Sequence, residues 1–248
     1  MVRGRSRVRF PILAQMNLAD KTILITGATG GIGSVLSQKL KDQGSNVITI
    51  GRDPNKPATY HADLTDPISR QELVNRIIQD YKKIDILIHS AGVGIYKPLS
   101  EITQSDWNLS FTLNVEAPFF LTQALSPILE KSSDSLVLTI GSGAGTIPMR
   151  GRSLYCATKF ALRGLMLSLA EESRNTHPSY CLITLGSTLT PFGPLSLDKK
   201  VEESLNGKAY FTPEWVANKL VEIMQNDDRE DEITLFPGDY GFGEWKKP

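Results

Sequence analysis

The sequence predicts an α/β protein with a single domain, built on a doubly wound parallel sheet of about seven strands with helices on both faces. Short β-branched runs alternate with helical stretches from Lys21 onward, which is the pattern of βαβ units that feed a parallel sheet. Most of these runs are continuously apolar, as strands covered on both faces require. The chain has 248 residues, 40% of them hydrophobic, which is enough for one large core, and no repeat or break in composition marks a second domain.

Seven segments have the length and composition of buried strands. They are Thr22–Thr26, Asn46–Ile50, Thr59–Ala62, Ile84–His89, Leu136–Ile140, Tyr180–Leu185 and Ile233–Phe236. Helices are expected between them, and three helix ends carry capping signals. Gly44 is placed to end the helix after the first strand, while Asp66 before Pro67 and Thr212 before Pro213 are placed to begin two others.

Two segments stand apart from this alternation. Residues 1–15 carry four arginines and no acidic residue, and we expect a basic N-terminal arm that is disordered or non-native rather than a targeting peptide. The predicted domain therefore covers residues 16–248. Within it, residues 187–211 form a Pro- and Leu-bearing stretch after the carboxyl end of a strand. We interpret this stretch as a substrate loop, because α/β sheets place their ligand contacts there.

The composition narrows the classes of partner. Lysine plus arginine and aspartate plus glutamate both number 27, for a formal net charge of +0, so no overall field attracts nucleic acid or anionic lipid and a small-molecule ligand is expected. No apolar run approaches the roughly 20 residues that span a bilayer, so no membrane contact is expected. Cys156 and Cys181 fall in a predicted core helix and a predicted core strand, which favours buried thiols and a cytoplasmic location.

The first predicted strand runs into a glycine-rich turn and then into a helix. Glycines in such a turn let the backbone take positive φ and let a pyrophosphate approach main-chain N–H groups at the positive end of the helix. A glycine cluster alone is a weak indication, but its place in the first βαβ unit strengthens it. The residues predicted to contact the phosphates are Gly27, Thr29, Gly30, Gly31, Ile32 and Gly33.

Thr26-Gly27 with Gly31 and Gly33 resembles the Thr-Gly-x-x-x-Gly-x-Gly signature of the short-chain dehydrogenase/reductase (SDR) family, classical branch. Gly30 also satisfies the spacing of the extended branch, whose members carry a further substrate domain for which this chain has no room. The resemblance covers nearly the whole predicted domain. It implies a Rossmann fold and an NAD(P)(H)-dependent oxidoreductase that interconverts a carbonyl and an alcohol on a small substrate.

The tip of the second predicted strand bears on which dinucleotide the site prefers. Gly51 and Arg52 stand at this tip, which faces the adenosine ribose. A carboxylate there would repel a 2′-phosphate, whereas a guanidinium can bind one bidentately. In the resembling family, glycine followed by arginine implies NADP(H). NAD(H) stays open, because Asp53 could take the carboxylate role if the strand end is shifted by two residues.

The resemblance also implies contacts with the rest of the cofactor. Asp63 and Leu64 match the aspartate and the apolar residue that contact the adenine. Ser90, Ala91 and Gly92 follow the fourth predicted strand, at the place of the family's Asn-Ala-Gly. Here Ser90 replaces an asparagine whose side chain stabilises the central sheet in the family, so that bond is not expected.

The segment after the sixth predicted strand resembles the family's Pro-Gly-x-x-x-Thr motif. Gly186 and Thr190 match it, Thr188 lies between them, and Leu185 stands where proline is usual. In the family this segment touches the nicotinamide carboxamide, so Gly186, Thr188 and Thr190 are predicted cofactor contacts. Without the proline, the turn is expected to be looser.

Tyr155 and Lys159 lie four residues apart, on one face of a predicted helix. A phenol has an unperturbed pKa of about 10, and a neighbouring ammonium favours the phenolate and lowers that pKa. Ser142, at the end of the fifth predicted strand, would project a hydroxyl beside a substrate carbonyl. Asn114 lies in an apolar helical stretch ahead of Pro118, where an asparagine at a helix kink, bonded to backbone, is the alternative.

In order and spacing these four residues resemble the family's Asn-Ser-Tyr-Lys tetrad, which implies their roles. Tyr155 would donate the proton to the carbonyl oxygen in reduction and remove it in oxidation. Ser142 would hydrogen-bond that oxygen. Lys159 would bind the ribose hydroxyls and lower the tyrosine pKa, and Asn114 would hold a water that continues the proton relay. The hydride chemistry belongs to the cofactor.

Apolar side chains near these positions are candidate walls of a substrate pocket and suggest a hydrophobic or aromatic carbonyl compound. They are Ile95, Tyr96, Ile147, Met149, Phe192, Leu195, Leu197 and Tyr210. Arg150 and Arg152 are candidates for binding an acidic group of the substrate, or for surface or subunit contacts. In the resembling family the helices that carry the asparagine and the tyrosine form a dimer face, so a homodimer or homotetramer is expected, and apolar runs at 119–121 and 165–167 allow it.

Two other functions are compatible with parts of this pattern. A nucleotide-sensing or scaffold protein would keep the dinucleotide site without turnover, and the intact tetrad argues against it. A sugar-nucleotide epimerase of the extended branch would carry a long C-terminal domain, for which the chain has no room. The oxidoreductase is therefore the favoured interpretation.

Overall fold

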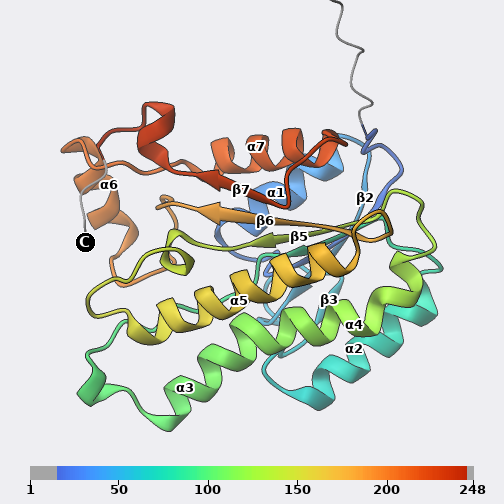
Figure 1. Cartoon of the computed structure of the whole chain (residues 1–248), viewed down its shortest axis with the longest axis horizontal. Coiled ribbons are helices and arrows are strands. Elements are labelled where there is room, and N and C mark those ends of the chain that lie inside the picture. The colour runs from blue at the N-terminus through green and yellow to red at the C-terminus, as the bar shows by residue number, and fades with distance from the viewer. Residues whose placement is uncertain (1–15, 245–248) are drawn as a thin grey trace, which may run out of the picture.

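The structure is a computed structural model that describes residues 16–244. Residues 1–15, where the sequence predicts a basic arm, and residues 245–248 lie outside the described residues. The rest forms the doubly wound α/β fold that the sequence predicts, a Rossmann fold with one parallel sheet between two layers of helices (Figure 1).

The seven strands pair in parallel in the order β3-β2-β1-β4-β5-β6-β7. Their bounds are Thr22–Thr26 (β1), Asn46–Gly51 (β2), Tyr60–His61 (β3), Ile86–His89 (β4), Leu136–Ile140 (β5), Ser179–Leu185 (β6) and Glu232–Leu235 (β7). The chain builds outward from β1 to β3 on one side and then from β4 to β7 on the other. The order thus reverses between β1 and β4, and open α/β sheets bind ligands beyond the carboxyl ends of the strands at such a point.

Helices cover both faces of this sheet. They are Gly31–Asp42 (α1), Pro67–Asp80 (α2), Gln104–Phe111 (α3), Ala117–Leu129 (α4), Ser153–Glu172 (α5), Leu197–Leu205 (α6) and Pro213–Gln225 (α7). Short 3-10 turns cover Leu99–Glu101, Gly143–Gly145 and Pro237–Tyr240, and a π turn, Thr112–Glu116, joins α3 to α4. In Figure 1, α1 and α7 lie together on one face and α2, α4 and α5 on the other, while α6 lies beyond the carboxyl ends of the strands.

Side chains of the central strands alternate between two cores, because successive residues of a strand point to opposite faces. Ile23 and Ile25 of β1 pack in the core beneath α1 and α7, whereas Leu24 packs in the core beneath α2 and α4. All three side chains are fully buried. The carboxyl ends of the central strands, which carry the candidate site, are therefore held from both sides.

The predicted strands are confirmed, with β1 and β5 at their predicted bounds and the others shifted by one or two residues. The largest difference is at β4, which begins at Ile86 rather than Ile84. Ile84 is buried, but its amide donates to the carbonyl oxygen of Ile128 at the end of α4, at 3.1 Å. Its apolar character therefore reports burial and not a place in the sheet.

The three predicted helix caps are also confirmed. The Asp66 carboxylate accepts from two backbone amides of the first turn of α2, and the Thr212 hydroxyl accepts from one in α7. Gly44 follows α1 with a φ of +85°, the left-handed conformation that favours glycine at a helix end.

Residues 187–211 contain α6, a helix that the sequence analysis does not predict. The Ser196 hydroxyl caps it by accepting a backbone N–H of its first turn. The two ends of the segment meet, since Phe211 donates its amide to the Ser187 carbonyl and accepts from the Leu189 amide, both at 2.9 Å. The segment therefore begins and ends at one anchored point beside β6.

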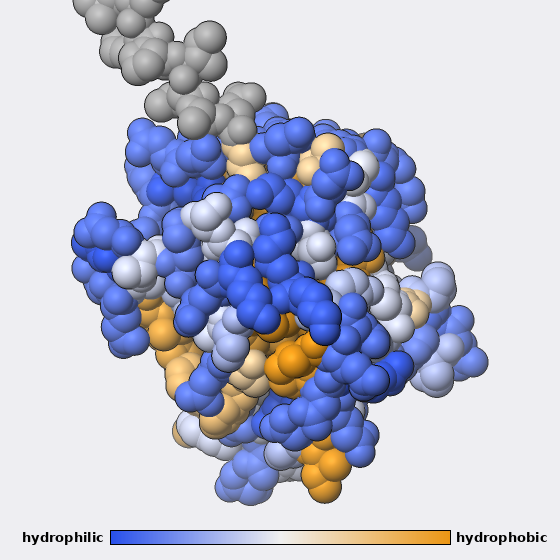
Figure 2. Space-filling view, turned by 90° about the vertical axis from the view of Figure 1, so that its right-hand side faces the viewer, coloured by the Kyte–Doolittle hydropathy of each residue, from blue (hydrophilic) through white to orange (hydrophobic). Residues whose placement is uncertain are grey.

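The cysteines are free and buried, Cys156 on α5 and Cys181 on β6, as predicted. Within residues 16–244, no helix combines the length and the apolar character needed to cross a membrane. Figure 2 views the molecule from the side at which the strands begin, and this face is mostly hydrophilic with a few apolar patches. The cavity described next lies on the opposite side, at the carboxyl ends of the strands.

Candidate active site

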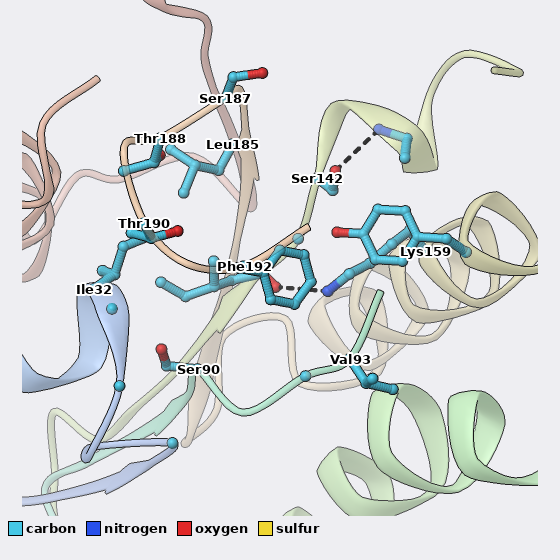
Figure 3. A pocket seen from close by; sticks show the side chains of 18 of the residues that line it. Ile32, Ser90, Val93, Ser142, Lys159, Leu185, Ser187, Thr188, Thr190 and Phe192 are labelled. Carbon is cyan, nitrogen blue, oxygen red and sulfur yellow. Dashed lines mark hydrogen bonds between the residues drawn. The ribbon is translucent and has the colours of Figure 1, made fainter. Parts of the chain in front are cut away.

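A cavity of about 880 Å³ lies at the carboxyl ends of the strands, where the sheet order reverses. It runs from the glycine-rich turn after β1 and the tip of β2 to the segments that follow β5, β6 and β7. Figure 3 shows Ile32 and Ser90 at one end, Ser142 and Lys159 at the other, and Thr190 on the segment that runs along it. One cavity therefore joins the predicted phosphate site to the predicted catalytic residues.

The glycine-rich turn is shaped by close backbone contacts. Gly27 has a φ of +68°, and a Cβ there would lie 2.8 Å from the backbone of Ala91, so only glycine fits. Gly33 does not line the cavity, which differs from its prediction as a phosphate contact. It packs against the Gly27 carbonyl oxygen, where a Cβ would collide, and so lets α1 approach the turn. The predicted residues that do line the cavity are Gly27, Thr29, Gly30, Gly31 and Ile32.

The centre of the sheet is tied by Thr26, the last residue of β1. Its hydroxyl accepts from the amides of Ser90 and Ala91, each at 3.2 Å, and donates to the Ile88 carbonyl at 3.4 Å. These bonds join β1 to the segment after β4 directly across the switch point. A threonine hydroxyl thus stabilises the junction here although Ser90 has replaced an asparagine, and Ser90, Ala91 and Gly92 all line the cavity.

The tip of β2 presents a guanidinium, not a carboxylate, to the cavity. Arg52 lines the cavity and is exposed. Asp53 lies outside the lining, and its carboxylate accepts from the backbone and side-chain amides of Asn55 at 3.0 and 3.2 Å. Gly51 packs directly against Thr29, because a Cβ on Gly51 would collide with the Thr29 methyl group.

Asp63 and Leu64, the predicted adenine contacts, also line this end of the cavity. The Asp63 carboxylate accepts from the hydroxyl and the amide of Thr65 at 2.6 and 2.9 Å. These bonds, together with the charge of Arg52, hold the pKa of Asp63 below its usual value. Asp63 is therefore an ionised acceptor, fixed in place by its own turn.

The segment after β6 lines the opposite side of the cavity with Gly186, Thr188 and Thr190. Leu185, where the family has proline, also lines it. The turn is nevertheless fixed, because the Gly186 amide donates to the Leu235 carbonyl of β7 at 2.8 Å and the glycine packs against the turn that follows β7. Contacts with the neighbouring strand thus take over the restraint that proline supplies elsewhere.

Lys200 on α6 is a cavity residue that the sequence analysis misses. It is only 6% exposed, and its ammonium donates to the Thr190 carbonyl at 2.7 Å and to the Phe192 carbonyl. Burial lowers its pKa. Lys200 therefore ties α6 to the segment after β6, and nothing in the local sequence separates it from Lys199.

Tyr155, Lys159 and Ser142 meet at the far end of the cavity, and all three line it. The Lys159 ammonium lies 5.9 Å from the centre of the Tyr155 ring and donates to the Ile140 carbonyl at 3.2 Å. The Ser142 hydroxyl accepts from the Ala144 amide at 3.1 Å, which leaves its own hydrogen for a second partner on the cavity side. Figure 3 shows the Ser142 and Lys159 side chains pointing into the cavity.

Burial dominates the electrostatics of this trio. It raises the pKa of Tyr155 to about 12 and lowers the pKa of Lys159 to about 8. The groups that lower the pKa of Tyr155 are the Ser142 hydroxyl, the charge of Arg152 and the Tyr96 hydroxyl, and Lys159 is not among them. The predicted lowering by Lys159 is therefore not found, and Tyr155 is a protonated phenol at neutral pH.

Asn114 is 1% exposed, lies in the π turn Thr112–Glu116 and does not line the cavity. Its side chain accepts from the Val93 amide and donates to the Val93 carbonyl, both at 2.8 Å, and donates to the Thr158 hydroxyl at 3.0 Å. The Thr158 hydroxyl in turn donates to the Tyr155 carbonyl at 2.9 Å. The alternative of a kink asparagine bonded to backbone thus describes its side chain, which positions the segments around Tyr155.

Most of the predicted substrate walls surround the same end. Tyr96, Ile147, Met149, Phe192, Leu195, Tyr210 and Arg152 line the cavity, whereas Ile95, Leu197 and Arg150 do not. Leu197 begins α6 and is 39% exposed. The rings of Tyr96 and Phe192 lie 5.3 and 6.0 Å from the ring of Tyr155. The turn after β7 adds residues that the sequence analysis does not predict, among them Phe236, Pro237, Gly238 and Asp239.

Comparison with known proteins agrees with this geometry. The model of the short chain dehydrogenase family matches residues 21–199. An uncharacterized oxidoreductase of Escherichia coli, YciK, is 34% identical over 191 residues, which cover 70% of this chain and 75% of that protein. A sepiapterin reductase of Chlorobaculum tepidum is 30% identical over 181 residues, with 72% of each chain covered. A short chain dehydrogenase structure from Shigella flexneri, complexed with NADP, is 27% identical, covers 88% of this chain and 98% of its own, and has a TM-score of 0.75.

The fold and the cavity define a dinucleotide-dependent oxidoreductase of the Rossmann type. The chain belongs to the short-chain dehydrogenase/reductase family, whose members use NAD(P). The residues present fit such a cofactor, because Gly27, Gly30 and Gly31 of the turn after β1 line the cavity without side chains and the cavity continues from there to Lys159.

Proposed function

We propose that this protein is an NADP(H)-dependent oxidoreductase that interconverts a carbonyl and an alcohol, with Tyr155 as general acid and base. The observation that carries the proposal is the single cavity that holds Tyr155, Ser142 and Lys159 at one end and the glycine-rich turn at the other. A phenol, a hydroxyl and an ammonium that converge beside a dinucleotide site supply the groups that carbonyl reduction requires.

Each side chain has a defined part in this reaction. When bound, the nicotinamide supplies or accepts the hydride. Lys159 binds the cofactor ribose, and Ser142 donates a hydrogen bond to the substrate carbonyl oxygen as charge develops there. Tyr155 transfers its phenolic proton to the same oxygen. Because burial raises its pKa to about 12, Tyr155 carries this proton at neutral pH.

The preference for NADP(H) rests on the tip of β2. Arg52 lines the cavity, and Asp53 is turned into its own loop by Asn55. A guanidinium at this place binds a 2′-phosphate, and no carboxylate of the tip is aimed into the cavity to repel it. The relative from Shigella flexneri was solved with NADP, which is consistent with this preference.

The remaining parts of the proposal concern access and assembly. Residues 187–211, tied down by Lys200, act as the substrate loop over an apolar pocket.

Phe120 on α4 and Phe160 on α5 are 46% and 45% exposed, which supports a homodimer or homotetramer formed through these helices. Leu121 and Met166, which belong to the apolar runs that we assigned to this face, are buried in the core instead. The free cysteines fit a cytoplasmic enzyme.

Titration with NADPH and NADH in parallel, followed by addition of pooled aldehydes and ketones, tests the proposal. We expect tighter binding of NADPH and its oxidation by at least one pool. Tyr155→Phe should bind NADPH normally and lose activity by about 10²–10⁴-fold. Tyr180→Phe is the matched control, because Tyr180 lies on β6 outside the cavity. Persistent NADPH binding with no turnover on any pool would favour the sensor or scaffold instead.

A further inference from the structure

The substrate end of the cavity contains a cation without an acidic partner. Arg152 precedes α5 and lines the cavity, half-buried. Its guanidinium carbon lies 5.2 Å from the centre of the Tyr96 ring, and one of its nitrogens contacts the Met149 sulfur at 3.6 Å. No Asp or Glu of residues 16–244 lies within salt-bridge distance of it.

The other cations at this end are already engaged. Lys200 donates to two backbone carbonyls, and Lys208 pairs with Glu203 at 2.8 Å. Lys159 donates to a backbone carbonyl at the end of β5. Among these cavity-lining cations of the described chain, Arg152 alone has no oxygen acceptor. Partial burial of a charge costs free energy that an ionic partner offsets, so the free guanidinium is available to a ligand that supplies the acceptor.

The position of Arg152 defines what that ligand can be. The Tyr96 ring neighbours both groups, because its centre lies 5.2 Å from the guanidinium carbon and 5.3 Å from the centre of the Tyr155 ring. The distance from the guanidinium carbon of Arg152 to the centre of the Tyr155 ring therefore cannot exceed these two distances added together. A small molecule can span such a distance. The face of Tyr96 and the Met149 sulfur hold the guanidinium plane, and a planar guanidinium binds a carboxylate bidentately.

We infer that the substrate is an oxo acid, whose carboxylate is bound by Arg152 while its carbonyl oxygen lies at Tyr155 and Ser142. This inference rests on the proposed function and adds the class of substrate. The apolar walls, among them Ile147 and Phe192, enclose the carbon chain between the two groups. A single free guanidinium matches a monoanion, whereas a phosphate dianion would require a second free cation beside it.

Arg152 has a second effect that the test must separate from binding. Its charge lowers the pKa of Tyr155, so its removal changes proton transfer for every substrate. A keto acid and its methyl ester share the same carbonyl chemistry, and the effect on Tyr155 acts on both equally. The ratio of kcat/KM for acid over ester therefore reports the carboxylate contact alone.

The experiment uses the full chain with NADPH, 4-oxo-4-phenylbutanoate and its methyl ester. We expect the acid to be favoured in the wild type by at least about tenfold, the size of one charge-assisted hydrogen bond or more. Arg152→Met should abolish this preference and Arg152→Lys should retain part of it. Arg150→Met, which removes an exposed arginine outside the cavity two residues away, should leave the preference unchanged.

Binding of 4-phenylbutanoate to the NADP-loaded protein gives a readout that does not need turnover. We expect its dissociation constant to rise about tenfold or more in Arg152→Met and to stay unchanged in Arg150→Met. An acid/ester ratio equal in the wild type and Arg152→Met would overturn the inference and leave the proposed function intact. An equal dissociation constant of 4-phenylbutanoate in the wild type and Arg152→Met would also overturn it. So would tighter Arg152-dependent binding of phenyl phosphate than of 4-phenylbutanoate. Absence of turnover with all carbonyl compounds, but with this binding pattern present, would contradict only the proposed reaction.

Discussion

Replacement of Asn114 by alanine should destabilise the protein strongly, although the residue does not line the cavity. Asn114 is 1% exposed, and its side chain makes both bonds to the Val93 backbone and one to the Thr158 hydroxyl. Alanine would leave the Val93 amide and carbonyl and the Thr158 hydroxyl without these partners. A polar group left unsatisfied in the interior costs about 1–3 kcal/mol.

Val93 is only partly buried, so water can reach its backbone groups and the lower end of that range applies to each bond. We therefore expect Asn114→Ala to lower the free energy of unfolding by about 3 kcal/mol. Thr158→Val is the matched comparison, because it removes only the bond to Asn114 and the bond to the Tyr155 carbonyl. It should cost about 1–2 kcal/mol.

Urea denaturation, followed by tryptophan fluorescence, measures both values. The reasoning would be refuted by an Asn114→Ala variant within about 0.5 kcal/mol of the wild type, which is the size of an ordinary surface substitution. A Thr158→Val variant that loses more stability than Asn114→Ala would refute it as well, since the Val93 bonds would then contribute nothing.

Three further variants test other parts of the site. Arg52→Ala should weaken NADPH binding by about tenfold and leave NADH binding within about twofold, as measured by calorimetry; equal losses for both would argue against a 2′-phosphate contact. Burial lowers the pKa of Lys159 from 10.5 to about 8. Between these pH values the unfolded chain binds more protons than the folded protein, so the free energy of unfolding rises with pH. In urea titrations, Lys159→Met should therefore raise the free energy of unfolding by about 2 kcal/mol at pH 7 and should not raise it above about pH 10.5. Burial also lowers the pKa of His89 to about 3, so the free energy of unfolding falls as the pH drops from about 6.5 toward 3. In His89→Gln, which can keep the bond to the Thr122 hydroxyl, the free energy of unfolding should fall less steeply with acid. An unchanged acid profile would contradict a buried, neutral His89.

The strands and the helix caps were predictable because local chemistry determines them. A short, continuous apolar run such as Leu136–Ile140 is typical of a strand buried on both faces, and Asp66 before Pro67 has the residue types of a helix start. Likewise, the fixed order of the sheet brings the residues after β1, β4, β5 and β6 to one edge. The meeting of Ser142, Tyr155 and Lys159 in one cavity follows from that topology.

The features that were not predicted depend on tertiary contacts. Lys200 differs from Lys199 only in the direction it takes from α6 toward the segment after β6. Gly33 belongs to the same glycine motif as its neighbours, and only the approach of α1 to Gly27 makes it a packing residue. The raised pKa of Tyr155 arises from burial by the surrounding chain, which sequence spacing does not report.

Transfer of deuterium from NADPH deuterated at C4 of the nicotinamide to a carbonyl product, with NADPH affinity measured in parallel, tests the central claim most directly. The account predicts that the wild-type protein places deuterium on the carbinol carbon, and that Tyr155→Phe binds NADPH within about threefold of the wild type while transfer falls by about 10²-fold or more. Undiminished transfer by Tyr155→Phe would contradict the account, as would a wild-type protein that binds NADPH and labels no carbonyl compound.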